Sequence, residues 1–256
     1  MIDDLATVSG LGQDILLHMF VVFLRIGAMV SLLPVFGEQT VPSRVKLALA
    51  IAFTVIVAPA IPPVPPIESV FDSIGILFAE ILTGLFLGLM LRLFVLALQI
   101  AGSIAAQSTS LSQLFGGGGM DLLPSMGHVL VVGGLALATI LGLHIQIVEF
   151  MIHTYIMIPI GNVIPANMIT QAGVAEISRS FALGFTLAAP FVIASLVYNV
   201  TLGIINKAMP QLMVAFVGAP AITAGGLIIL TLAAPLMLSL WIEAVGQFMI
   251  DPFGDR

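Results

Sequence analysis

The segment Ser103–Met120 reads SIAAQSTSLSQLFGGGGM, a polar but uncharged stretch with four consecutive glycines near its end. It is set between runs of sequence that are apolar enough for a lipid bilayer. An irregular backbone exposed to lipid would leave its peptide groups without hydrogen-bond partners, at a cost of roughly several kcal/mol each. The segment is therefore expected to lie in water, at an interface or inside an aqueous channel.

The whole chain has the composition of an integral membrane protein. Hydrophobic residues make up 60% of it and charged residues 8%, whereas soluble domains carry about 25% charged residues. A net charge of -6 with only seven lysines and arginines provides no basic surface for a nucleic acid. The absence of cysteine excludes disulfides, zinc thiolate sites and thiol catalysis.

Six long apolar runs are each close to the roughly 20 residues that an α-helix needs to cross a bilayer. They cover about Ile15–Leu33, Val45–Val57, Ile74–Leu98, Val129–Met151, Phe181–Ile205 and Ile222–Ile242. The runs are apolar throughout, whereas the strands of a transmembrane barrel alternate apolar and polar residues. The sequence therefore predicts an all-α membrane protein with six crossings. Arg44, Lys46 and Lys207 lie in connections that we expect on the cytoplasmic side, where cations are enriched.

Ionisable residues at membrane depth are candidates for function, because burying a charge there is costly. They are Arg25, Glu80, Arg92, Glu149 and Glu243. Glu80 and Arg92 are separated by about 120° around a helix and about 18 Å along it, so they cannot pair within one helix. Each needs a partner from elsewhere. A structural interhelical ion pair is the favoured interpretation, and a proton relay is the alternative.

Candidate metal and nucleotide motifs have structural explanations. His144 and His153 point to opposite faces of a helix and cannot share a metal. Glu149 and His153 do share a face, and a helix-end salt bridge is the favoured interpretation of that spacing. The four glycines lack the lysine of a phosphate-binding loop. Gly84 and Gly88 form a GxxxG pair, which predicts close approach of another helix.

These observations leave two classes of function. One is a proton- or ion-coupled transporter built around Arg25, Glu80 and Glu149. The other is a component of a larger membrane machine, without an enzyme site or a cofactor of its own.

Three groups of residues favour the second class. The first group is Arg25, Leu33-Pro34-Val35-Phe36-Gly37, Val41-Pro42, Lys46-Leu47-Ala48-Leu49-Ala50 and Pro59; the second is Ala101-Gly102, Gln107 and Asp121; the third is Ala189-Pro190, Gly203, Lys207, Pro210-Gln211 and Gly218-Ala219-Pro220. With these three groups in this order along the sequence, the chain resembles the FliR family of flagellar type III export-gate proteins, which is related to the SctT proteins of injectisomes. The four glycines replace a more apolar run of that family, and Lys207 stands where it usually has arginine.

The resemblance implies a role without enzymatic activity. One copy of such a chain joins several copies of FliP-like and FliQ-like subunits in a helical assembly that encloses the channel for exported flagellar proteins. Residues 1–180 would be the FliP-like part and residues 181–256 the FliQ-like helical hairpin. The resemblance also implies a place in the bacterial inner membrane, in the flagellar basal body.

Two sites follow from the same resemblance. A plug that closes the channel is expected at about 108–124, within a polar loop at about 103–124, with Asp121 anchoring one end. Its residues are Gln107, Ser108, Ser110, Ser112, Gln113, Gly116, Gly117, Gly118, Gly119 and Asp121. The hairpin tip, with Lys207, Pro210 and Gln211, is expected to contact a switch protein of the FlhB type.

Overall fold

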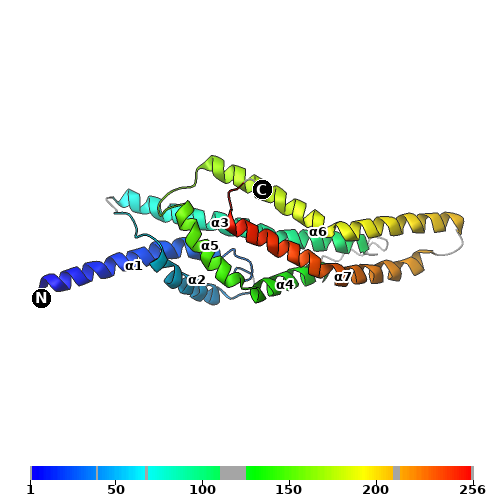
Figure 1. The fold of residues 1–256 in the computed structure, drawn as a ribbon, viewed down its shortest axis with the longest axis horizontal. Coiled ribbons are helices and arrows are strands. Elements are labelled where there is room, and N and C mark those ends of the chain that lie inside the picture. The colour runs from blue at the N-terminus through cyan, green and yellow to red at the C-terminus, as the bar shows by residue number, and fades with distance from the viewer. Residues whose placement is uncertain (1, 39, 67–68, 110–124, 210–213, 255–256) are drawn as a thin grey trace. The chain divides into compact units, whose positions relative to one another are not determined.

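Helices dominate the part of the chain that the structure describes. The computed structural model describes residues 2–38, 40–66, 69–109, 125–209 and 214–254. Its elements in these ranges are α1 (Ile2–Val30), α2 (Ser43–Val57), the 3-10 turn η1 (Ala58–Ala60), α3 (Val70–Thr109), α4 (Ser125–Ile140), α5 (Leu143–Met157), α6 (Ala166–Ala208) and α7 (Val214–Ile250) (Figure 1). The predicted all-α fold is confirmed.

Five of these helices are long and apolar enough to cross a membrane, and α4 and α5 form a sixth candidate when they are counted as one broken span. The longest are α3 with 40 residues, α6 with 43 and α7 with 37. At about 1.5 Å per residue each of the three is much longer than the roughly 30 Å of a hydrocarbon core. Parts of all three therefore extend beyond what a single crossing requires.

The expected crossing at 129–151 is divided between two helices, which together form one span only when a broken span is counted. α4 and α5 are bent by 76° relative to one another at a short break. Gly142 lies in this break with a φ of 81°, a left-handed conformation that glycine adopts without the steric cost of a Cβ. Both helices are apolar, so the hydrophobic run continues through the bend and conceals it.

The expected start of an irregular loop at Ser103 is also wrong, because α3 continues to Thr109. The hydroxyl groups of Ser108 and Thr109 each donate to the carbonyl oxygen of Ala105, both at 2.9 Å. Such bonds satisfy polar side chains within a helix. A polar composition therefore does not end the helix here. α6 likewise begins at Ala166, well before the apolar run that was expected from Phe181.

Prolines lie at both ends of α2, where the N–H donor that proline lacks is not needed to continue the helix. α2 begins directly after Pro42, whose φ of -58° and ψ of 143° are those of an extended residue before a helix. It ends in a 3-10 turn that contains Pro59. Pro190 is an exception, because it lies inside α6.

The chain forms two compact units, and each is interrupted in sequence. Unit 1 is Met1–Arg92, Thr139–Glu176 and Gly246–Arg256. Its buried core includes Ile26, Met29, Leu87, Phe150 and Phe248. The rings of Phe150 and Phe248 lie 6.0 Å apart between centroids, which joins α5 to the last turn of α7.

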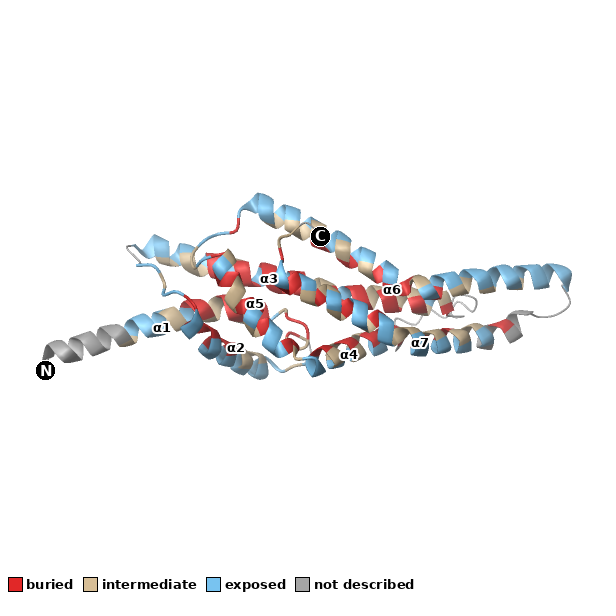
Figure 2. Ribbon diagram, viewed as in Figure 1, coloured by how far each residue is buried: buried red, intermediate tan, exposed pale blue. Residues whose placement is uncertain are grey.

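Unit 2 is Leu93–Ala138 and Ile177–Val245. Its core is built around Trp241 of α7, which is fully buried and donates from Nε1 to the carbonyl oxygen of Phe94 at 2.7 Å. Figure 2 shows buried residues as stripes along the helices and a largely exposed surface on α6. The predicted boundary between residues 180 and 181 falls inside α6 and does not coincide with the units; the subdivision by sequence relationship stays a prediction.

Candidate functional site: the base of the polar loop and a buried ion pair

The two helices that flank residues 110–124 touch through their backbones in unit 2. Gly102 of α3 lies so close to α4 that a Cβ built on it would be 2.1 Å from the Cα of Gly127. No side chain fits in that space, so glycine is required at 102 by packing. We call this contact, together with Thr109 and Met126, the loop base.

Thr109, the last residue of α3, connects the loop base to α7. It is buried, and its hydroxyl lies 3.7 Å from the sulfur of Met126. Thr223 of α7 donates to the carbonyl oxygen of Thr109 at 3.5 Å, and a Cβ at Gly226 would lie 2.4 Å from the Thr109 methyl group. The chain therefore leaves α3 at a point fixed by both α4 and α7.

Only two of the predicted plug residues belong to the described part of the chain. Gln107 is exposed on the last turns of α3, and Ser108 is half-buried. The other plug residues lie outside the described residues: Ser110, Ser112, Gln113, Gly116, Gly117, Gly118, Gly119 and Asp121. Their role as a plug stays a prediction.

The predicted hairpin tip is described on the side of α6 only. Lys207 is exposed in the last turn of that helix, and Pro210 and Gln211 lie outside the described residues. Near the tip, the hydroxyl of Tyr198 donates to the carbonyl oxygen of Gly218 of α7. This contact holds the two helices of the hairpin together.

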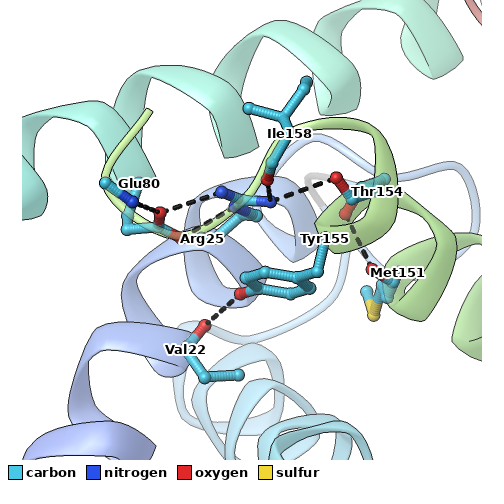
Figure 3. Close-up of polar contacts among 8 residues, drawn as sticks. Val22, Arg25, Glu80, Met151, Thr154, Tyr155 and Ile158 are labelled. Carbon is cyan, nitrogen blue, oxygen red and sulfur yellow. Dashed lines mark hydrogen bonds and ion pairs between the residues drawn. The ribbon is translucent and has the colours of Figure 1, made fainter. Parts of the chain in front are cut away.

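In unit 1 the structure pairs Arg25 with Glu80, and both side chains are fully buried (Figure 3). Arg25 Nε donates to Glu80 Oε2 at 2.7 Å, and Nη2 donates to Oε1 at 2.8 Å. The guanidinium therefore binds the carboxylate at two points, the strongest arrangement for such a pair. The contact joins α1 to α3.

The end of α5 completes this ion pair. Arg25 Nη1 donates to the carbonyl oxygens of Ile158 at 2.9 Å and Thr154 at 3.4 Å, and the Gly161 N–H donates to Glu80 Oε1 at 3.0 Å. The guanidinium carbon lies 3.9 Å from the centre of the Tyr155 ring. Four of the five N–H donors of arginine are thus used, and the charge is stabilised as a buried charge must be.

Arg92 has a different and more exposed partner. Its Nη1 lies 3.2 Å from Glu38 Oε1 and its Nη2 lies 3.4 Å from Oε2, with the two side chains 23% and 21% exposed. Sequence reasoning required partners for Glu80 and Arg92 outside α3 but could not name them. Glu38 lies in the connection between α1 and α2, where no helical periodicity indicates which way a side chain faces. Main-chain carbonyl groups such as those at the end of α5 cannot be recognised from the sequence.

Glu149 is exposed and lines a pocket of about 480 Å³ together with His153, Gln146 and the last turn of α7. The expected salt bridge between Glu149 and His153 is not formed; among the described residues, no ion pair or hydrogen bond connects these two side chains. Four-residue spacing places two side chains on one face but does not bring their charged atoms together. No three His, Asp or Glu residues of the described ranges are grouped closely enough for a metal ion.

The GxxxG pair of α3 packs against α1, as the sequence predicts. A Cβ at Gly84 would lie 2.2 Å from the carbonyl oxygen of Arg25, and one at Gly88 would lie 2.9 Å from that of Met29. This approach brings Glu80, one turn before Gly84, to the Arg25 side chain.

Comparison with known proteins places the chain in a family. Residues 16–248 match the model of "Bacterial export proteins, family 1". The flagellar biosynthetic protein FliR of Caulobacter vibrioides is 32% identical over 89% of this chain and 92% of its own length. The FliR proteins of Pectobacterium carotovorum and Escherichia coli are 31% and 30% identical, each over 84% of this chain and 83% of their own length.

The matches cover both compact units and all three groups of residues that carried the resemblance, apart from the chain ends. With its five or six candidate spans, the chain is a membrane-embedded component of flagellar protein export. It belongs to the FliR family of bacterial export proteins.

Proposed function

We propose that this chain is a structural and gating subunit of the flagellar type III protein-export channel in the bacterial inner membrane. The observation that carries the gating role is the backbone contact between Gly102 and Gly127. The contact brings together the helices that precede and follow residues 110–124. A plug that moves aside and closes again would need its two flanking helices held together in this way.

The composition of segment 110–124 suits a conduit for exported proteins. Ser110, Ser112 and Gln113 offer hydrogen bonds without a fixed charge, and Gly116–Gly119 allow close backbone approach. Asp121, near the α4 end, is the single charge of the segment. A plug built from such residues seals against water and neighbouring loops without holding a charged substrate.

The exposed apolar surface supports a role as one subunit among several. In the most apolar 18-residue segments of α6 and α7, only 28% and 17% of the segment is buried, compared with 67% for α3. Phe185 and Ile193 on α6 and Leu232 on α7 are among the exposed side chains. FliP-like and FliQ-like subunits, several copies of each around one copy of this chain, would cover the surface that lipid does not.

Conductance of the assembled complex in a planar bilayer tests the gate. Deleting Gly116–Gly119 shortens the anchored segment, and we expect a raised ion leak in the absence of substrate. Replacing the same four residues by Gly-Ser-Gly-Ser keeps length and flexibility and is the matched control, which should stay closed. Equal conductance of the deletion and the native complex would contradict a plug.

The exposed Lys207 at the end of α6 is the proposed contact for an FlhB-type switch protein at the cytoplasmic entrance. Its ammonium is available to an acidic partner because, within the described ranges, it forms no ion pair. A photocrosslinker at position 207 should capture that protein. Capture of FliP-like and FliQ-like neighbours alone would overturn the assignment.

The arrangement of two of the three residues proposed for a transporter, Arg25 and Glu80, supports the channel subunit instead. Arg25 and Glu80 bind one another and the backbone, so they offer no open position to an ion. Purification distinguishes the two functions as well. A channel subunit should co-purify with two small apolar proteins in unequal copy number, whereas a transporter should be stable as a monomer or symmetric oligomer.

A further inference from the structure

A groove of about 280 Å³ lies between α1 and α2 in unit 1. Its walls are apolar and include Phe23, Gly27, Leu47 and Ala50. Gly27 is one of the lining residues, and a Cβ built on it would be in ordinary contact with the Phe23 ring at 3.6 Å, so a bulky side chain at this position would compete for the same space. The groove lining is predominantly apolar, which suits a flexible chain of methylene groups.

The two helices of the groove are antiparallel, and a lysine lies at one end of it. Lys46, near the start of α2, donates from Nζ to the carbonyl oxygen of Gly37 at 2.9 Å, just beyond the end of α1. At the other end of the same helix pair, His18 Nε2 lies 2.9 Å from the carbonyl oxygen of Ala58. Lys46 and Ser31 therefore line one end of the groove, and Phe23 and Ala50 lie farther along it.

The charge at the lysine end of the groove is not compensated within the described part of the chain. Lys46 is half-buried and uses one of its three N–H donors on Gly37, which leaves two. The nearest acid in sequence, Glu38, is paired with Arg92. The first turn of α2 contains no acidic residue and its N-terminus has no side-chain cap, so the helix dipole adds to the positive potential there.

The groove opens on a surface suited to lipid. α1 and α2 are both candidate membrane spans, and only 33% and 28% of their most apolar 18-residue segments is buried. Leu47, Ile51 and Val55 are each about half exposed on α2. Lysine at the end of an apolar helix extends its ammonium to the headgroup level of a bilayer.

We propose that this groove binds one acyl chain of an anionic phospholipid, whose phosphate is held by Lys46 Nζ. A free phosphate would leave the apolar walls empty, and a neutral lipid would leave the ammonium without an anion. The proposal requires only that the chain is embedded in a membrane and does not depend on the gate. Because acyl chains are already in an apolar medium, selectivity comes from the headgroup, and we expect about a fivefold preference from one lysine.

Photolabelling of the native export complex in vesicles tests the proposal. Two lipids carry the same diazirine-bearing acyl chain, one as phosphatidylglycerol and the other as phosphatidylcholine. We expect the phosphatidylglycerol probe to label the peptides around Phe23–Ser31 and Leu47–Ala50 about fivefold more than the phosphatidylcholine probe. Equal labelling by the two probes would overturn the proposal, and this comparison needs no variant.

Matched variants locate the site. Lys46→Gln should lower the phosphatidylglycerol signal to that of phosphatidylcholine, while Lys46→Arg should retain it. Arg44→Gln removes the same charge from the same helix, two residues away and outside the groove lining, and should retain most of the preference. Equal losses in Lys46→Gln and Arg44→Gln would show a general surface effect and contradict a site.

Filling the groove gives a second and independent test. Gly27→Leu places a side chain in the acyl position, and labelling by both probes should fall at these peptides while membrane abundance is kept. Unchanged labelling would exclude the groove as the binding place. A crosslink from position 47 to another subunit, with no lipid labelling, would show that protein occupies the groove and would overturn the proposal.

Discussion

Arg25 of α1 and Glu80 of α3 form a two-point ion pair, with nitrogen to oxygen distances of 2.7 and 2.8 Å and both side chains fully buried. The same guanidinium binds carbonyl groups at the end of α5, and the same carboxylate accepts the Gly161 N–H. Three helices of unit 1 therefore meet at one pair of charges. Each charge depends on the other, because neither has access to water.

Removing one charge of the Arg25–Glu80 pair should lower the stability of the folded chain. We expect Arg25→Met to destabilise the chain by about 3 to 5 kcal/mol, because it leaves the Glu80 carboxylate buried without its partner. Glu80→Met should have a similar cost for the guanidinium. The double variant should lose much less than the sum, because no unpaired charge remains. The measurement is the temperature at which half of the detergent-solubilised chain is lost from solution; additive losses would contradict the coupling.

The ion pair of Arg92 and Glu38 should contribute far less. It has longer distances of 3.2 and 3.4 Å, and about a fifth of each side chain is exposed. Partly solvated pairs of this kind are worth about 0 to 1 kcal/mol. Arg92→Gln therefore provides a matched control for Arg25→Met in the same melting experiment. If Arg92→Gln lowered the melting temperature as much as Arg25→Met, burial would not be what makes one ion pair more important than the other.

Gly84 should tolerate no side chain, because α1 passes directly over it. Gly84→Val would place a Cβ 2.2 Å from the Arg25 carbonyl oxygen and 2.9 Å from the Ala28 Cβ, so the two helices must separate. We expect low membrane abundance and a melting temperature close to that of Arg25→Met. Gly75→Ala on the same helix meets nothing within 4 Å and should be neutral or slightly stabilising. Equal abundance of the two variants would refute close packing at Gly84.

The sequence alone predicted the all-α membrane fold, and the GxxxG pair correctly indicated a close helix approach. Both predictions rest on features within a single helix: the length of an apolar run and the spacing of two glycines. The bend at Gly142 was missed because an apolar run has no feature that distinguishes one straight helix from two. The helical state of 103–109 was missed because Ser108 and Thr109 form their hydrogen bonds inside the helix, where composition suggests a loop.

The candidate sites were predictable to different extents. That Arg25 and Glu80 need partners followed from the cost of burial, but their pairing with one another depends on how α1 crosses α3. Glu38 lies in a connection, and its distance from Arg92 in sequence gives no indication of contact. The loop base could not be foreseen, because Gly102 and Gly127 are separated by the polar segment and become neighbours only through the fold.

The loop base should respond asymmetrically to a single methyl group. A Cβ at Gly102 would lie 2.1 Å from the Gly127 Cα, whereas one at Gly127 would lie 3.6 Å from the Gly102 Cα, an ordinary contact. Gly102→Ala should therefore force α3 and α4 apart, and Gly127→Ala should be accommodated. If segment 110–124 closes the channel, the first variant raises the resting conductance of the complex in a planar bilayer and the second leaves it unchanged. The two variants differ from the native chain by the same atoms, so an equal effect on conductance would mean that the contact does not hold the gate.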